Sequence, residues 1–374
     1  MRANDVLGII QAQDYENAAP ELTSVRTMAS VPFGCRYRFI DFPLSTMVNA
    51  GITQIGIITK DNYQSLMDHV GSGKPWDLAR KREGMFLLPP YNIMQGAGSL
   101  SRNTWLESLF SIMHFLQKAR QEYVCIADTN TVYNFDFNDI FDFHTEKEAD
   151  ITIVYKHGPL PKANNMVVLD INDDARITDC SVVDSAAGEV DYCFNIFVMR
   201  KTLLLNLLTT AMAHGATSFF KDIIQAHVGD MKIVGYEATG FAEMIDSLKT
   251  YYAVNMSLLN PENRESLFRK DNPIITKISD NVPATYGPEC KVVNSLVADG
   301  CVIEGEVENS LLFRGVTVEK GAVVKNCILM QGTIVHSGAV LDSVIGDKNV
   351  TITNSRTLTG DPNFPIYITK NIQV

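Results

Sequence analysis

A six-residue repeat in the last quarter of the chain most restricts how this sequence can fold. Apolar residues recur every six positions, at Val316, Ala322, Ile328, Ile334 and Val340, and a second series, Val318, Val324 and Met330, lies two residues behind. This spacing matches neither the 3.6-residue period of a helix nor the two-residue period of a strand. It is typical of a parallel β-helix, in which each triangular coil stacks on the one before. We therefore expect a β-helix over residues 283–374, with a run of ordinary short strands as the alternative.

The first two thirds of the chain have a different pattern. Apolar strand-like segments at 52–59, 123–127, 151–155, 166–171 and 194–199 alternate with helical segments at 104–118, 202–208, 218–227 and 247–259. Such alternation predicts an α/β domain over residues 1–258 with a mostly parallel sheet, covered on both faces. Ligands of such sheets bind at the carboxyl ends of strands, here after Ile10 and Ala127. Residues 259–282 contain Pro261 and Pro273, and we expect a linker there.

Composition excludes several classes of partner. The 32 Lys and Arg against 43 Asp and Glu leave a net charge of −11, which argues against nucleic acid and anionic membranes. No apolar run approaches the roughly 20 residues of a membrane span, and the first ten residues do not resemble a signal peptide. Seven cysteines without a C-x-x-C pair indicate reduced thiols. We expect a cytoplasmic protein with no metal held by cysteine.

The loop after the first strand lacks the residues that bind phosphate. The strand VLGII begins at Val6 and is followed by Gln11-Ala12-Gln13-Asp14-Tyr15-Glu16-Asn17. Phosphate loops use glycines to bring backbone N–H groups close and a cation to neutralise charge. This loop has no glycine, and its only charges, Asp14 and Glu16, would repel a triphosphate. It is either unrelated to phosphate binding or has lost that function.

Five sequence blocks resemble bacterial ADP-glucose pyrophosphorylases (glucose-1-phosphate adenylyltransferases), in the same order and at the same spacing. The blocks are VPFGCRYRFIDFPLSTMVNAGI from Val31, HVGSGKPWDL from His69, LLPPY from Leu87, YVCIADTNTVYNFDF from Tyr123 and CFNIFVM from Cys193. The resemblance covers nearly the whole chain. It implies a Rossmann-like nucleotide-diphospho-sugar transferase domain followed by a left-handed β-helix of hexapeptide repeats. It also implies a role in making ADP-glucose from ATP and glucose 1-phosphate, with Mg²⁺, for glycogen biosynthesis.

The chain departs from that family at the positions that do the chemistry. The first glycine positions of the family's GGxGTRL loop are Ala12 and Gln13, followed by Asp14, and Met28 replaces the lysine of a Lys-Pro pair. The two metal-binding aspartates align with Asn130 and Met244, and the lysine that meets the sugar phosphate aligns with Val183.

These replacements predict a subunit without catalytic or metal-binding residues. An amide and a thioether are poor substitutes for the carboxylates that hard Mg²⁺ prefers. Without metal and cationic loop, the charge developing on the transferred group is not stabilised. The pattern is most similar to the GlgD-type, non-catalytic regulatory subunit of the family. We expect no cofactor on this chain, Mg²⁺ in a catalytic partner, and a heterotetramer with that partner; the open ends of the β-helix are also compatible with a homo-oligomer.

Two other functions remain open. The chain could be a weakly active nucleotidyltransferase that uses other carboxylates, such as Asp128 or Asp136, or a stand-alone binding protein for a sugar phosphate or effector. A hexapeptide acyltransferase with His336 as its base has no place for the first 255 residues, and we interpret His336 as a turn residue.

Three arginines, Arg26, Arg36 and Arg38, are candidates for binding an anionic effector such as a phosphorylated metabolite. The resemblance places them near the family's effector site. The alternative is that they brace the fold through Asp41 or Glu21.

Overall fold

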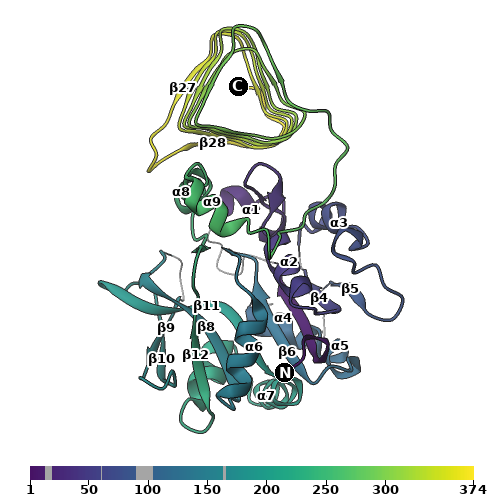
Figure 1. Cartoon of the computed structure of the whole chain (residues 1–374). Coiled ribbons are helices and arrows are strands. Elements are labelled where there is room, and N and C mark those ends of the chain that lie inside the picture. The colour runs from purple at the N-terminus through teal and green to yellow at the C-terminus, as the bar shows by residue number, and fades with distance from the viewer. Residues whose placement is uncertain (13–18, 60, 90–103, 163–165) are drawn as a thin grey trace.

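The protein is described by a computed structural model over residues 1–12, 19–59, 61–89, 104–162 and 166–374. Figure 1 shows a layered α/β domain, with a triangular coil of strands above it. The expected sites Gln13 and Asp14 lie outside the described residues. The α/β domain is built on a sheet in the order β10-β9-β11-β6-β1-β4-β5, in which β8 pairs with β11 and β12. Its strands are β1 Val6–Gln11, β4 Gln54–Ile58, β5 Gly84–Leu88, β6 Tyr123–Asp128, β8 Ile151–Pro159, β9 Met166–Ile171, β10 Ile177–Val183, β11 Glu189–Arg200 and β12 Ile233–Glu237.

The sheet is mixed, which corrects the expectation of a mostly parallel one. β5, β4, β1 and β6 run parallel, but β11 runs antiparallel to β6, β8 and β9, and β9 to β10. The reason is that β8 to β11 follow one another through short connections, which reverse the chain, whereas a parallel crossover needs a helix between strands. Six of the nine strands were predicted, with β11 and β8 longer than expected, whereas β5, β10 and β12 were not predicted. Two short pairs lie outside this sheet, β2 Pro32–Phe33 with β3 Tyr37–Arg38 and β7 Thr131–Tyr133 with β13 Ala242–Met244.

Helices cover both faces of the sheet and leave two apolar layers. Leu44 of α2 and Phe141 of α6 pack on one face, whereas Leu109 of α4 and Leu208 of α7 pack on the other. The helix expected over 104–118 is broken at Ile112 into α4 and α5. The helices are α1 Pro20–Thr23, α2 Asp41–Asn49, α3 Gln64–Val70, α4 Trp105–Ser111, α5 Met113–Lys118, α6 Phe137–Glu146, α7 Lys201–Ala213, α8 Leu248–Ser257 and α9 Pro261–Leu267, with 3₁₀ turns η1 Ala3–Asp5, η2 Met28–Ser30 and η3 Lys74–Trp76 and a π-helical turn η4 Phe220–Gln225.

The C-terminal region is a parallel β-helix made of three five-stranded sheets, as the repeat predicts. The first sheet has β14 Thr285–Tyr286, β17 Val302–Ile303, β20 Thr317–Val318, β23 Ile334–Val335 and β26 Thr351–Ile352. The second has β15 Lys291–Val293, β18 Glu306–Glu308, β21 Val323–Lys325, β24 Val340–Asp342 and β27 Thr357–Thr359. The third has β16 Leu296–Val297, β19 Leu311–Leu312, β22 Ile328–Leu329, β25 Val344–Gly346 and β28 Ile366–Ile368.

Most coils contain 17 residues, one fewer than three hexapeptides. Val318 pairs with Val335 and Val335 with Ile352, so the true core rows repeat at this spacing. Residues spaced strictly six apart therefore do not keep the same position in successive coils. Val316, Ala322, Val318 and Val324 are inside, Ile328 and Met330 face the α/β domain, and Ile334 and Val340 face outward.

One side of the triangle packs on the α/β domain (Figure 1). The outward residues of its third sheet are apolar, and they join one continuous core with α8 and the segment 28–42. Polar contacts also cross the same boundary, among them Tyr252 Oη donating to Asn326 O (2.7 Å) and Cys35 Sγ to Leu296 O (3.6 Å). The segment 259–282, where we expected a linker, contains helix α9 and the buried residue Ile274.

None of the described helices is long and apolar enough to cross a membrane.

Candidate functional site

The carboxyl ends of β1 and β6 meet at one edge of the sheet, where ligands of this fold class bind. Gln11 and Asp128 are partners in the parallel register of the two strands. Thr129 Oγ1 donates to the carbonyl of Gln11 (2.9 Å) and so links the two loops. This is the edge that the sequence pattern predicted.

The second group of replaced residues lies at the same edge. Ala12 N donates to Ile58 O (3.0 Å), and Ala12 O accepts from Ala29 N (3.3 Å). Met28, next to Ala29 in η2, is fully buried in the apolar cluster that the α/β domain shares with the β-helix. The side chain at 28 therefore contributes to packing, whereas a lysine at the same place would bring a charge into that core.

Asn130 and Met244 lie side by side, although 113 residues separate them in the chain. The strands β7 and β13 pair so that Thr131 faces Met244, and Ile245 N donates to Asn130 O (2.7 Å). Met244 is 5% exposed. Asn130 Oδ1 and Thr131 Oγ1 are buried, and neither has a hydrogen-bond partner among the described residues. The fold thus brings together the two positions that the resemblance assigns to metal-binding aspartates.

This pair does not fit a Mg²⁺ ion. Asn130 offers one neutral amide oxygen and Met244 a thioether, whereas Mg²⁺ needs hard, charged oxygen ligands in near-octahedral geometry. The residues that the structure describes contain no group of three His, Cys, Asp or Glu side chains arranged for a metal.

Nearby carboxylates have other contacts. Asp128 is 6% exposed, and its Oδ1 accepts from Thr129 N (2.6 Å). Asp246 accepts from Ser247 Oγ (2.9 Å), Thr250 Oγ1 and Lys162 N, so it fixes the start of α8 and holds a neighbouring loop. Asp136 caps α6 through Asn138 N (2.9 Å) and belongs to that helix start. Of the two alternative carboxylates, Asp128 is the one at the strand edge.

Val183 ends the edge strand β10, where it pairs with Met166 and is half-buried. β10 is the outermost strand of the sheet, on the far side of β9 and β11 from β6. No contact described in the structure joins Val183 to Asn130 or Met244.

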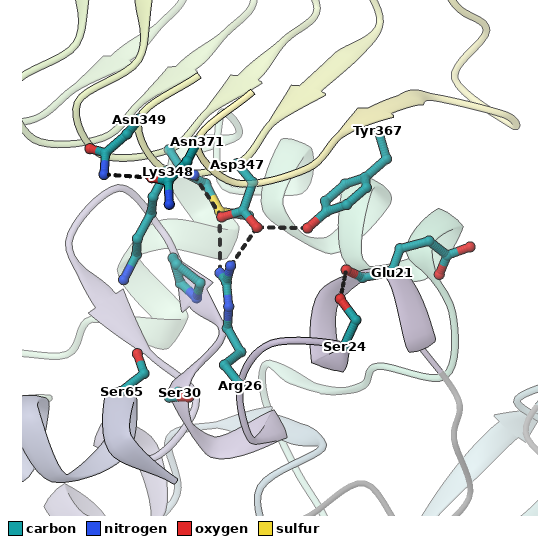
Figure 2. A network of polar contacts seen from close by, with 12 residues as sticks. Glu21, Ser24, Arg26, Ser30, Ser65, Asp347, Lys348, Asn349, Tyr367 and Asn371 are labelled. Carbon is teal, nitrogen blue, oxygen red and sulfur yellow. Dashed lines mark hydrogen bonds and ion pairs between the residues drawn. The ribbon is translucent and has the colours of Figure 1, made fainter. Parts of the chain in front are cut away.

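The first of the three candidate arginines, Arg26, is sealed between the two domains. It is 3% exposed and forms an ion pair with Asp347, which is fully buried at the end of β25 in the β-helix. Asp347 also accepts from Tyr367 Oη (2.7 Å) and from the backbone N of Lys348 (2.6 Å). Figure 2 shows the guanidinium reaching up to this carboxylate with Tyr367 beside it. The carboxylate that braces Arg26 is therefore Asp347, and neither Asp41 nor Glu21.

The other two arginines differ in exposure. Arg38 is half-buried, and its guanidinium donates to the carbonyl (2.5 Å) and hydroxyl (3.0 Å) of Ser65. Its backbone N donates to Asp41, whose carboxylate also contacts His69 Nε2 (2.6 Å). Arg36 is exposed, 5.8 Å from the centre of the Tyr37 ring, and forms no ion pair with a described residue.

A third cation, Lys348, joins Arg26 and Arg38 from the β-helix. Burial, together with the charges of Arg38 and Arg26, lowers the pKa of the Lys348 ammonium to about 7. Burial likewise lowers the pKa of Arg38 to about 10, and Arg26 adds to this effect while Asp41 opposes it. We name Arg26, Arg38 and Lys348 the interdomain cations.

Asp347 and Lys348 were missed by sequence reasoning, although a signal existed. Ala298, Phe313, Met330 and Asp347 occupy the same place in successive coils, on the side that packs against the α/β domain. A carboxylate in an otherwise apolar row needs a buried partner. His336, the other polar residue considered, pairs with Glu319 (Nδ1 to Oε1, 2.9 Å) on the β-helix and is one-third exposed.

Comparison with known proteins agrees with this architecture. A nucleotidyl transferase family model matches residues 20–180, and a GlmU-like, C-terminal hexapeptide model matches residues 280–364. The glycogen biosynthesis protein GlgD of Bacillus subtilis (strain 168) is 36% identical over 369 residues, which are 99% of this chain and 97% of that protein. The chain belongs to the GlgD family. GlgD of Geobacillus stearothermophilus is 38% identical over 86% of this chain and 83% of its own.

The GlgD family is itself related to an enzyme family. A glucose-1-phosphate adenylyltransferase of Clostridium botulinum (strain Alaska E43 / Type E3) is 32% identical over 87% of this chain and 84% of its own. The resemblance to ADP-glucose pyrophosphorylases, and the combination of a nucleotidyltransferase domain with hexapeptide repeats, are thereby confirmed.

Proposed function

We propose that this chain is a catalytically degenerate, regulatory subunit of glucose-1-phosphate adenylyltransferase in bacterial glycogen biosynthesis. The observation that carries the proposal is the closeness of Asn130 and Met244, whose neighbour Ile245 donates its N–H to Asn130 O (2.7 Å). An amide and a thioether stand where transfer of a nucleotidyl group needs carboxylate-bound metal. In this proposal the chain binds no cofactor, and Mg²⁺ belongs to a catalytic partner.

The partner we propose is a catalytic glucose-1-phosphate adenylyltransferase subunit, with which the chain forms a cytoplasmic heterotetramer. Support comes from membership in a family whose relatives carry that enzyme name. A subunit without its own turnover can act only by contacting the active and inactive states of its partner differently. A phosphorylated metabolite that regulates the mixed enzyme would meet the exposed Arg36 and the half-buried Arg38 on this subunit.

The test is an activity assay of this chain alone, of a catalytic subunit alone, and of the two mixed. We expect no ADP-glucose synthesis by the chain alone with Mg²⁺ or Mn²⁺, and a changed rate or substrate dependence when it is mixed with the catalytic subunit. The mixture should elute as one complex in size-exclusion chromatography.

The same assay examines the second candidate, a weakly active nucleotidyltransferase. It is favoured by the buried Asp128 carboxylate at the strand edge. Turnover by protein free of catalytic subunit, abolished in Asp128→Ala and retained in the helix-cap variant Asp136→Asn, would replace our proposal with this one. Failure of the two chains to co-elute would favour a stand-alone binding protein.

A further inference from the structure

The boundary between the domains concentrates positive charge in an otherwise acidic protein. The chain carries a net charge of −11, yet three cations converge where the β-helix meets the α/β domain. Arg26 comes from the loop before η2, Arg38 from β3 and Lys348 from the residue after Asp347. Like charges in a poorly solvated place repel strongly, so such a group needs an anion.

The anion is supplied by the chain itself. The Asp347 carboxylate is fully buried and binds the Arg26 guanidinium, the Tyr367 hydroxyl and the Lys348 backbone N–H (Figure 2). Proteins bind phosphate groups in the same way, by surrounding one oxyanion with several hydrogen-bond donors. Here each of these donors is already satisfied by a side chain of the same polypeptide.

The remaining cations lack a comparable partner. The Arg38 guanidinium donates to Ser65, a neutral residue. The Lys348 ammonium forms no ion pair or hydrogen bond with a described side chain, and Figure 2 shows it extending toward the α/β domain beside Arg26. Removal of the Asp347 carboxylate would leave Arg26 without its ion-pair partner and Lys348 without the one negative charge of a described residue that acts on it. Arg38, in contrast, would keep the charge of Asp41 nearby.

We propose that Asp347 is an internal anion that occupies the interdomain cation site, so that the isolated chain excludes phosphate-type ligands from Arg26 and Lys348. The contact both fastens the β-helix to the α/β domain and keeps this anion site closed. Neutralising Asp347 opens the site to an external oxyanion, which then takes over the carboxylate's place. The inference concerns the isolated chain, and it holds or fails independently of the proposed regulatory function.

The experiment measures binding of inorganic phosphate to the full-length chain. Wild type, Asp347→Asn and the matched control Glu308→Gln are titrated with phosphate at constant ionic strength, by isothermal calorimetry and by thermal unfolding. Glu308 lies in the β-helix too, where it pairs with Lys325 (3.2 Å) on the second sheet, so this control removes the same charge elsewhere. We expect Asp347→Asn to bind phosphate about tenfold or more tightly than wild type, within the range of ordinary coupling between sites. Phosphate should also restore its lost thermal stability, and Glu308→Gln should behave as wild type.

Two further variants separate loss of charge from loosening of the boundary. Tyr367→Phe removes one hydrogen bond to Asp347 but leaves the charge, so its phosphate affinity should equal that of wild type. Arg26→Ala combined with Asp347→Asn should abolish the gain. Equal phosphate binding by wild type and Asp347→Asn, or an equal gain in Tyr367→Phe, would overturn the proposal.

The test also covers a variant that does not fold in chloride. Asp347→Asn and the smaller Asp347→Ser are then refolded in phosphate and in chloride at the same ionic strength. Recovery in phosphate alone supports the inference, because an external oxyanion has replaced the carboxylate. Failure in both salts contradicts it.

Discussion

At the scale of single residues, what matters most is where the side chains are charged and where they are neutral. Asn130 and Met244 are neutral at the two positions that the resemblance assigns to metal-binding aspartates, and Met28 is apolar and fully buried. Two buried charges, Arg26 and Asp347, form an ion pair across the contact between the domains. Neutral side chains thus occupy the two aligned positions, and a buried ion pair lies where the two domains touch.

Lys348 gives a prediction at this scale. Because burial, Arg38 and Arg26 lower its pKa to about 7, the folded chain binds this proton less well than the unfolded chain does between pH 7 and pH 10. Folding stability from this group therefore rises with pH across that window and is lowest below pH 7. We expect Lys348→Met to raise the free energy of unfolding by about 1–2 kcal/mol at pH 7, after allowance for partial exposure.

The measurement is urea unfolding of wild type and Lys348→Met at pH 6.5, 8 and 9.5. The advantage of the variant should shrink as pH rises, because releasing the proton of the wild-type lysine on folding then costs less free energy. Lys325→Met, on the solvent side of the second sheet, is the control and should show no such trend. If the difference in unfolding free energy between Lys348→Met and wild type does not depend on pH, Lys348 is not desolvated.

At the scale of elements, the β-helix shows how close packing between coils restricts the sequence. Gly305 lies under the next coil, and a Cβ atom there would collide with the carbonyl of Ala322 and stand 2.7 Å from that of Glu319. Backbone atoms cannot rotate away as a side chain can. The glycine is required by stacking rather than by an unusual backbone angle.

We therefore predict that Gly305→Ala destabilises the chain by about 2 kcal/mol or more, through overpacking between coils. Gly229→Ala is the matched control, because that glycine is exposed and a Cβ atom there would meet nothing within 4 Å. Thermal unfolding followed by circular dichroism compares the two. Equal melting temperatures would show that the coils separate easily at this point.

At the scale of the whole molecule, the two domains share one apolar core. Residues of η2, β2, α2 and α8 pack with Phe313, Met330 and Ile345 of the β-helix in a continuous cluster. The ion pair of Arg26 with Asp347 lies within the same boundary. Neither domain can leave the other without exposing a large apolar surface, and for that reason a chain cut near residue 260 is a poor probe of subunit assembly.

Cooperative unfolding of both domains follows from this shared core. The two tryptophans, Trp76 and Trp105, both lie in the α/β domain, so their fluorescence reports on that domain alone. Hydrogen exchange of peptides from 311–346 reports on the β-helix. We expect the two probes to give the same urea midpoint. Protected β-helix amides beyond the fluorescence transition would show that the domains unfold separately.

Sequence by itself determined the features that are encoded in short windows. The six-residue period predicted the β-helix, and the alternation of apolar segments predicted most of the strands of the sheet. The resemblance predicted that Asn130 and Met244 occupy the positions of two metal-binding aspartates, and the pairing of β7 with β13 places these two residues close together. These features depend on local periodicity and on motifs that need no knowledge of the rest of the fold.

Tertiary structure alone decided the direction of the central strands, the 17-residue length of the coils and the partner of Arg26. Arg26 and Asp347 are 321 residues apart, and the sequence around either residue does not predict that the other is its partner. Their pairing arises only when an apolar side of the β-helix docks on the α/β domain and brings a single carboxylate over a group of cations. Whether a charge is buried depends on which surfaces of the two domains pack together. That packing is determined by contacts along both domains and not by any one segment.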